Sequence, residues 1–281
     1  MVINDLSGQA DGSGAAQSAA DEVVKEIKAF GGEAVANYDS VTDFNGARRI
    51  IDAAINTFGK LDILVNNAGF LRDRMIFNMA EEDWDAVVTV HLKGTFNCAR
   101  HACVYWRELN KAGKPVSGRI INTASDIAVF YNPSQSNYGA AKSGILAFSM
   151  IIAKEMAKYG VTCNVIVPMA RTRLTATPTT GPSMGTPEDF TKKFGFDILD
   201  PDNIAPVVGY LASDDARDIS GQVFRVAGGT VWLLQGWHTA GKINKKAKWM
   251  PQELGSQIKG LIAKAPPPED VQAIMKDFGV M

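Results

Sequence analysis

Apolar residues recur along this chain with two alternating periods, one typical of strands and one typical of helices. Short apolar runs predict strands at Val2–Leu6, Ala34–Tyr38 and Leu61–Val65. The last run is unbroken, as in strands that are buried on both faces of a parallel sheet. Between these runs, Ala15–Phe30 and Asp43–Phe58 have apolar positions at helical spacing, and each ends at a glycine. The pattern therefore predicts repeated βαβ units.

The same alternation continues through most of the remaining chain. It predicts helices at Trp84–Trp106, Tyr138–Tyr159, Ile204–Ala212 and Pro251–Ala263, and strands at Arg119–Thr123, Thr162–Val167 and Gln222–Val226. Such alternation favours the α/β class with a doubly wound parallel sheet, a Rossmann-like fold. The segment Arg171–Asp200 loses periodicity and is rich in Thr, Pro and Gly, so we expect a lid or substrate loop there.

Charge and cysteine usage restrict the classes of partner. The 281 residues include 29 Lys and Arg against 30 Asp and Glu, which gives no reason to expect nucleic acid or a membrane surface as a partner. No apolar run reaches the ~18 residues of a membrane span, and the first residues do not resemble a signal peptide. Cys98, Cys103 and Cys163 have no metal-ligand spacing and read as reduced thiols, so we expect a cytoplasmic protein without a metal.

Three residues have the types and spacing of a proton-transfer site. Tyr138 and Lys142 stand four apart in a helical segment and share one face, and Ser125 lies thirteen residues upstream, just past a strand. A lysine beside a phenol favours the phenolate, so we expect a lowered pKa for Tyr138. Such a tyrosine can exchange a proton with an alcohol or carbonyl oxygen that the serine also binds. Alone, Tyr138 and Lys142 would equally suit an ordinary pair on a helix surface.

These residues resemble the ordered motif set of the short-chain dehydrogenases/reductases. Asn66-Asn67-Ala68-Gly69 follows a buried strand, Ser125 precedes Tyr138-x-x-x-Lys142, and Pro168 closes the next strand. The resemblance covers residues 1–230 and implies a dehydrogenase domain, with 231–281 as an extension packed on that domain or on a partner subunit. It implies Tyr138 as acid/base, Ser125 on the substrate oxygen and Lys142 on the cofactor ribose. It further assigns Asn67, Ala68, Gly69, Pro168 and Thr172 to cofactor binding.

One departure from the family pattern narrows the resemblance. His91 stands where most members have a catalytic Asn, within VHLKGTF. With LRDRM at Leu71–Met75, this resembles the (3R)-hydroxyacyl-CoA dehydrogenase units of peroxisomal multifunctional enzymes type 2 and single-domain actinobacterial dehydrogenases. His91 is then either a member of a catalytic water relay or a satisfied core histidine.

The resemblance implies an oxidoreductase that interconverts a secondary alcohol and a ketone with NAD, first of all a (3R)-3-hydroxyacyl-CoA and a 3-oxoacyl-CoA. The small-molecule substrate is then an acyl-CoA or a steroid-like molecule. A hydroxysteroid dehydrogenase and a 3-oxoacyl carrier-protein reductase are alternatives. Four arginines lie on loops expected near the site, where they would meet CoA phosphates or simply be solvated: Arg72, Arg74, Arg171 and Arg173.

The glycine-rich segment from Gly8 to Gly14 permits two alignments with the family, or registers, which differ in whether the strand before it is strand one or strand two. In the first, Val2–Leu6 is strand one and Gly8–Gly14 is the phosphate loop of the cofactor. In the second, which resembles the hydroxyacyl-CoA dehydrogenases, that strand is strand two. Asp5 then binds the adenosine ribose, which favours NAD over NADP, and Asp39 and Ser40 flank the adenine. We prefer the second register, because the strand before Asn66 would otherwise be third instead of fourth.

The second register implies that the first βα unit of the fold is absent. Strand one is central in the order 3-2-1-4-5-6, so its loss would leave the neighbouring edges unpaired or make them pair directly. A catalytically silent subunit is therefore an alternative to an enzyme. Oligomerisation is also expected, as a homodimer or homotetramer. The predicted helix Tyr138–Tyr159 has apolar residues enough for a core face and a partner face, although burial within one subunit is the competing explanation.

Overall fold

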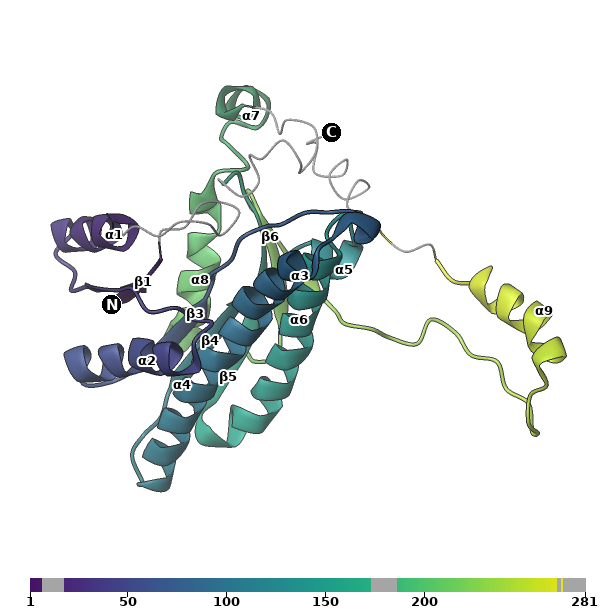
Figure 1. Cartoon of the computed structure of the whole chain (residues 1–281), viewed down its shortest axis with the longest axis horizontal. Helices are drawn as coiled ribbons and strands as arrows, with labels where there is room; N and C mark the ends of the chain where they lie inside the picture. Colours follow the sequence, from purple (N-terminus) through teal and green to yellow (C-terminus); the bar gives the residue numbers. More distant parts are fainter. Residues whose placement is uncertain (7–17, 173–185, 267–268, 270–281) are drawn as a thin grey trace.

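The computed structural model describes residues 1–6, 18–172, 186–266 and 269, which form an α/β domain with an extended arm (Figure 1). The strands are β1 (Val2–Asn4), β2 (Val35–Asn37), β3 (Ile63–Asn66), β4 (Gly118–Thr123), β5 (Val161–Met169), β6 (Val223–Ala227) and β7 (Thr230–Leu234). The α-helices are α1 (Ser18–Ala29), α2 (Phe44–Phe58), α3 (Glu81–Val88), α4 (Gly94–Lys111), α5 (Ile127–Phe130), α6 (Ser136–Met156), α7 (Pro187–Phe194), α8 (Ala205–Ala212) and α9 (Pro251–Ile262). Thr89–Lys93 (η2) is a π-helical turn that joins α3 to α4.

The main sheet has the strand order β3-β4-β5-β6-β7. All neighbours are parallel except β7, which is antiparallel to β6. Every residue of β4 is buried, because helices cover both faces of the sheet (Figure 1). On one face Ile120 packs with residues of α2, α4 and α6, and on the other face Ile121 packs against α8. The doubly wound parallel sheet expected from the sequence is confirmed.

The first two strands form a separate sheet. β1 pairs in parallel only with β2, in the register Val2 to Val35 and Asn4 to Asn37. Among the described residues, no strand lies between β1 and β3, and these two strands do not pair with each other. Of the two outcomes expected for the second register, the structure therefore shows unpaired edges and not a closed sheet.

The outer strand β3 is also open on one of its faces. Ile63 and Val65 point to the face that Ile121 shares with α8, and they are 42% and 43% exposed. Leu64 points to the other face and is buried in the main core. An uninterrupted apolar strand with one exposed face is unusual for a parallel sheet. Among the described residues, β3 is therefore uncovered both along its outer edge and on this face.

Several elements differ from those that the sequence predicts. β7 was not predicted, and it continues the sheet to Leu234, beyond the boundary expected at residue 230. α7 lies within the segment expected to be an aperiodic loop, where Thr186 and Asp189 form a capping box at its start. A helix this short shows too few apolar repeats to be recognised by periodicity. The helix expected at Trp84–Trp106 is divided by η2 into α3 and α4.

The helix proposed for subunit contacts is α6. Ile145, Ile152 and Met156 are buried in the domain, whereas Ile151 is 54% exposed. Burial within one subunit therefore accounts for most of this apolar surface. Among the described residues, no helix combines the length and apolar character that crossing a bilayer requires.

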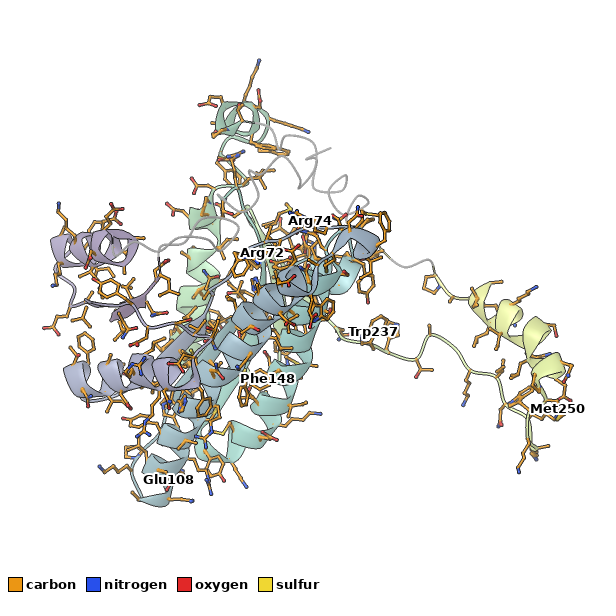
Figure 2. The ribbon with its side chains drawn as sticks, in the orientation of Figure 1. Arg72, Arg74, Glu108, Phe148, Trp237 and Met250 are labelled. Carbon is orange, nitrogen blue, oxygen red and sulfur yellow. The ribbon has the colours of Figure 1, made fainter. Side chains whose placement is uncertain are left out.

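Residues 235–250 run away from the domain and lead to α9 at the far end of an arm (Figure 1). Figure 2 shows Trp237 and Met250 on this arm, and both side chains are exposed. Ile258 and Ile262 of α9 are exposed as well. The arm therefore presents apolar side chains that the domain does not cover.

Candidate active site

Asparagine side chains join the carboxyl ends of β3 and β4 beneath the candidate site. Asn66 donates a 2.8 Å hydrogen bond from Nδ2 to Oδ1 of Asn122, and Asn122 donates in turn to the Ser149 hydroxyl on α6 at 2.8 Å. Asn122 and Ser149 are fully buried, so each bond also satisfies polar atoms that water does not reach. This network sets the position of α6 relative to the loop that begins at Ser125.

Ser125, Tyr138 and Lys142 come together at this end of the sheet. Ser125 follows β4, and its side chain hydrogen-bonds the half-buried Tyr138 of α6. Lys142 lies one helical turn further and is 3% exposed. Its Nζ donates to the carbonyl oxygen of Thr123 at 2.7 Å and lies 5.6 Å from the centre of the Tyr138 ring. The three candidate catalytic residues therefore form one cluster.

The expected direction of the Tyr138 pKa is wrong. Burial of the phenol, opposed by the hydrogen bond to Ser125, raises the pKa of Tyr138 to about 12. Burial also lowers the pKa of Lys142 to about 7, so near neutral pH much of the lysine is uncharged. Attraction between ammonium and phenolate would lower the pKa of Tyr138, but the desolvation of both groups outweighs it.

His91 lies in the π-helical turn η2 and is 2% exposed. Its Nε2 is 2.8 Å from the carbonyl oxygen of Phe70, and its ring meets the Tyr138 ring edge-on at 5.1 Å between centroids. Burial lowers the pKa of His91 to about 3, so the ring is neutral at physiological pH. Nδ1 is buried and has no partner in the described protein. One nitrogen is thus satisfied, as in a core histidine, and the other is available to a small polar molecule.

Gly69 provides the space that the His91 ring occupies. A Cβ at Gly69 would collide with Cε1 of His91, so these two positions are sterically linked. Asn67 and Ala68 precede Gly69 directly after β3, and both are exposed. The backbone of this segment is therefore accessible at the same end of the sheet as Tyr138.

Asn137 is a site residue that the sequence did not single out. It is fully buried, and its Nδ2 donates to the carbonyl oxygens of Arg72 and Asp83 at 3.0 and 3.1 Å. Its Oδ1 accepts a 2.7 Å bond from the Tyr138 backbone N–H. The residue thereby fixes the start of α6 to the loop after β3. Its only signal in the sequence was its position beside the tyrosine.

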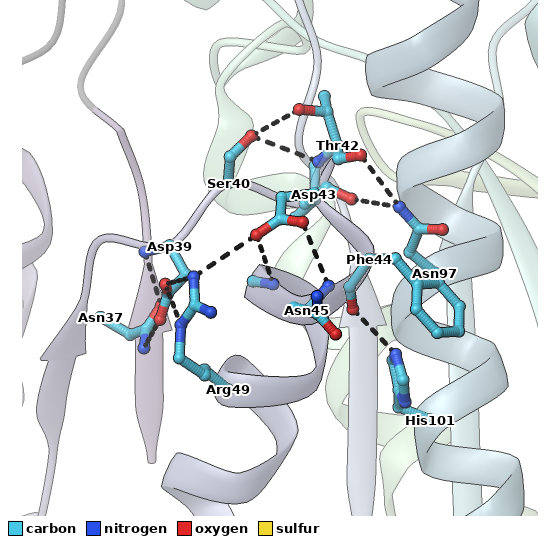
Figure 3. Close-up of polar contacts among 12 residues, drawn as sticks. Asn37, Asp39, Ser40, Thr42, Asp43, Phe44, Asn45, Arg49, Asn97 and His101 are labelled. Atoms are coloured by element: carbon cyan, nitrogen blue, oxygen red, sulfur yellow. Dashed lines mark hydrogen bonds and ion pairs between the residues drawn. The ribbon is translucent and has the colours of Figure 1, made fainter.

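The residues assigned to the adenosine half of a cofactor follow β1 and β2. Asp5 lies just past β1, and its backbone N–H donates to the carbonyl oxygen of Asn37 at 3.3 Å. Asp39 is held by Arg49 through Nε at 2.7 Å, which lowers the pKa of the Asp39 carboxyl (Figure 3). Ser40 shares a 2.8 Å hydrogen bond with the hydroxyl of Thr42. These contacts order the loop that leads into α2.

Of the other positions assigned to the cofactor, some are among the described residues and some are not. Pro168 is in β5, and Thr172 lies three residues beyond its end, both near the carboxyl edge of the sheet. The segment from Gly8 to Gly14 lies outside the described residues. The structure therefore places Ser125, Tyr138, Lys142 and Pro168 at one end of the main sheet, whereas Asp5, Asp39 and Ser40 follow the strands of the two-stranded sheet.

The candidate phosphate-binding arginines already have carboxylate partners. Arg171 pairs with Asp197 at 2.6 Å. Arg72 and Arg74, labelled in Figure 2, approach Asp83 at 3.8 and 3.9 Å. Arg173 lies outside the described residues. These pairs give Arg72, Arg74 and Arg171 structural roles within the protein.

The fold and the Ser125, Tyr138 and Lys142 cluster define an oxidoreductase of the short-chain dehydrogenase type. Residues 13–231 match the sequence model of the family described as "Enoyl-(Acyl carrier protein) reductase". The chain belongs to the short-chain dehydrogenase/reductase family, whose enzymes use NAD or NADP and small-molecule substrates.

Individual relatives agree with this family. A solved structure of a short chain dehydrogenase from Mycobacterium avium is 46% identical, with a TM-score of 0.83, and the match covers 96% of this chain and 88% of that one. Hydroxyacyl-CoA dehydrogenase ChsB1 of Mycobacterium tuberculosis is 36% identical over 97% of this chain and 84% of its own length. Peroxisomal multifunctional enzyme type 2 of Drosophila melanogaster is 44% identical over 81% of this chain. The chain spans only 35% of the length of that relative.

Proposed function

We propose that this chain is an NAD-dependent dehydrogenase that interconverts a (3R)-3-hydroxyacyl-CoA and a 3-oxoacyl-CoA. The observation that carries the proposal is the cluster of Ser125, Tyr138 and Lys142 beside an exposed backbone segment after β3. The substrate class is supported by the names of the relatives, among them a hydroxyacyl-CoA dehydrogenase.

In this proposal the substrate oxygen binds between the hydroxyls of Ser125 and Tyr138. During oxidation, Tyr138 passes its own proton to the uncharged Lys142 amine and accepts the alcohol proton, while the hydride leaves C3. Because burial raises the pKa of Tyr138 to about 12, the site holds the phenol protonated, ready to donate to a carbonyl in the reverse direction. Lys142 then contributes by proton exchange and by its contact with the ribose, and its pKa of about 7 suits it to release or accept a proton near neutral pH.

We expect the described residues to hold the nicotinamide end of NAD. The exposed Asn67 and Ala68, the buried Lys142 ammonium and the carboxyl end of β5 at Pro168 and Thr172 would hold the nicotinamide and its ribose. At the other end, Asp5 would bind the adenosine ribose, with Asp39 and Ser40 beside the adenine. Bound NAD supplies the carbon that accepts the hydride. Asp5 is the observation that favours NAD over NADP, since its carboxylate would repel a 2′-phosphate.

His91 serves this site through its unshared nitrogen. Nε2 is engaged by Phe70, whereas the buried Nδ1 has no partner among the described residues, in a ring whose centre lies 5.1 Å from that of Tyr138. A water held at Nδ1 would connect the site to solvent. This water relay is the role we propose for the histidine.

A second candidate is a 3-oxoacyl carrier-protein reductase. It is supported by a 37% identical enzyme of that name from Synechocystis and by the description of the matching family. The two are separated by the preferred cofactor and thioester carrier. We expect turnover of the (3R) but not the (3S) hydroxyacyl-CoA with NAD. Faster reduction of a carrier-protein thioester with NADPH would favour the reductase, and turnover of a hydroxysteroid instead would favour the hydroxysteroid dehydrogenase.

A catalytically silent subunit is the alternative from another class, motivated by the unfilled position between β1 and β3. Titration of the chain with NADH separates it from the enzyme. Stoichiometric binding with quenching of tryptophan fluorescence is expected for the enzyme, and absence of binding would support the silent subunit.

We further infer that the protein acts as a homodimer or homotetramer in the cytoplasm. The arm supports the first inference, because Trp237 is 94% exposed and α9 exposes Ile258 and Ile262 away from the domain. Of the extension expected at residues 231–281, residues 231–234 belong to β7 of the main sheet, and we propose that the part from residue 235 onward packs on a partner subunit. The free thiols of Cys98 and Cys163, both buried, support a reducing compartment. Analytical ultracentrifugation of the chain with and without residues 235–281 tests the role of the arm.

A further inference from the structure

A buried ion pair joins the residue after Ser125 to a distant strand. Arg225 in β6 donates to the Asp126 carboxylate from Nε at 2.8 Å and from a terminal nitrogen at 3.1 Å. The arginine side chain is 3% exposed and the aspartate side chain 13% exposed. A bidentate pair of this kind fixes orientation as well as distance.

The arginine is itself confined on two sides. Its guanidinium lies 4.5 Å from the centre of the Trp232 ring, which belongs to β7. On the same guanidinium, a terminal nitrogen is 3.8 Å from the sulfur of Met169 at the end of β5. Arg225 therefore has little freedom to change its conformation without displacing strands of the main sheet.

Asp126 is the N-cap of the short helix α5, and it directly follows Ser125 in the chain. Its backbone carbonyl accepts hydrogen bonds from the N–H groups of Val129 and Phe130 at 3.0 and 2.8 Å. The Ser125 carbonyl accepts from Ala128 at 2.9 Å, so serine and aspartate share one turn of backbone. A shift of the Asp126 carboxylate would be transmitted to the serine hydroxyl through that turn.

We propose that the Asp126–Arg225 pair is a positioning device, which holds the Ser125 hydroxyl against Tyr138 by anchoring the α5 turn to β6 and β7. Neither residue touches the reacting atoms, so both are positioning residues. The proposal deepens the dehydrogenase function above and rests on it. It also gives β7, the strand that the sequence did not predict, a part in the site through Trp232.

The pair has an electrostatic consequence for Tyr138. Charged or titratable groups face this phenol from several sides: Lys142 on its own helix, Asp73 in the loop after β3, His91 in η2, and Asp126. Both Asp73 and Asp126 raise the pKa of Tyr138, because a negative charge opposes formation of the phenolate. The positive charge of Arg225 offsets part of the negative charge of Asp126. Loss of the arginine alone would therefore strengthen the opposition to ionisation, and loss of both charges would remove the share that Asp126 contributes, leaving the effects of burial and of Asp73.

The test compares Arg225→Lys, Arg225→Met and the double variant Asp126→Asn/Arg225→Met with the wild-type chain. Lysine keeps the charge but loses the bidentate geometry. We expect kcat to fall about tenfold in Arg225→Lys and further in Arg225→Met, with KM changed less than about threefold. In Arg225→Met the ionisation of Tyr138 in the pH profile of kcat should move to higher pH. In the double variant the same ionisation should move back to lower pH.

A matched control is available at the other end of the same sheet. Arg119 in β4 is also buried, with its side chain 4% exposed and 3.5 Å from Asp214. Arg119→Lys should leave kcat and the pH profile unchanged. If Arg119→Lys lowers kcat as much as Arg225→Lys, the effect is one of general stability and the proposal is overturned. It is equally overturned if Arg225→Lys keeps kcat within about twofold of wild type.

One measurement does not depend on turnover. Amide hydrogen exchange at Ala128, Val129 and Phe130 reports the bonds of the α5 turn directly. We expect faster exchange at these amides in Arg225→Lys and unchanged exchange in Arg119→Lys. If the wild-type chain oxidises no hydroxyacyl-CoA, the proposed substrate is wrong, and exchange still decides whether the pair anchors the turn. Unchanged exchange in Arg225→Lys and Arg225→Met would overturn the positioning role.

Discussion

Lys142 donates a 2.7 Å hydrogen bond from Nζ to the carbonyl oxygen of Thr123, the last residue of β4. The contact ties the catalytic helix to the strand that leads to Ser125. It also takes the ammonium into a buried position, and burial lowers the pKa of Lys142 to about 7. The lysine therefore titrates within the pH range in which the enzyme would work.

This titration predicts a pH-dependent effect of Lys142→Met on stability. In the unfolded chain the lysine keeps its proton up to its usual pKa of 10.5, whereas the folded protein releases it above about 7. Stability should then rise with pH between these values, because the unfolded state binds more protons. We expect Lys142→Met to be more stable than wild type at pH 6 by a few kcal/mol. The gain should shrink towards pH 10 in urea unfolding experiments. A difference that is constant across this range would contradict the buried titration.

The steric link between Gly69 and His91 predicts coupled substitutions. Gly69→Ala introduces a Cβ where Cε1 of His91 lies, so we expect a loss of stability of about 1–3 kcal/mol. Combining it with His91→Ala should cost less than the sum of the two single changes. Gly255→Ala on α9 is the control, because a Cβ there meets nothing and the helix gains from alanine. Additive losses in the double-mutant cycle would show that the ring does not occupy this space.

The open face of β3 predicts unequal costs for one substitution at two sites. Val167 in β5 is fully buried, whereas Val65 in β3 is 43% exposed. Val167→Ala should destabilise this chain by about 2 kcal/mol, and Val65→Ala by less than about 1 kcal/mol. Both free energies come from denaturant unfolding. Equal costs would mean that something in the folded protein covers the β3 face.

The main sheet followed from the sequence because its strands are long apolar runs. The residues of β5 predicted as a strand are all buried, and the register with β4 brings the motif residues to one edge. β7 was missed because Gly228 and Gly229 made the preceding strand look like the last, and a hairpin partner depends on that turn. The spacing of apolar residues does not distinguish the π-helical turn at His91 from the α-helices on either side of it.

The sequence predicted which residues form the candidate site. It did not predict the pKa values of those residues. Spacing alone put Tyr138 and Lys142 on one helical face. The direction of the Tyr138 pKa depends on how deeply the phenol is buried, which the spacing of residues in the sequence does not reveal. The partner of Asp126 is 99 residues away, a separation at which no local pattern indicates contact.

The turnover of Tyr138→Phe tests the central claim most directly. Phenylalanine keeps the ring that packs edge-on against His91 and removes only the hydroxyl. Oxidation of a (3R)-3-hydroxyacyl-CoA with NAD should be measured at saturating substrate for wild type, Tyr138→Phe and the control Tyr159→Phe, whose ring lies at the far end of α6. We predict a fall in kcat of at least about a hundredfold for Tyr138→Phe and no fall for the control. Retention of more than about a tenth of the wild-type kcat by Tyr138→Phe would contradict its role as acid/base.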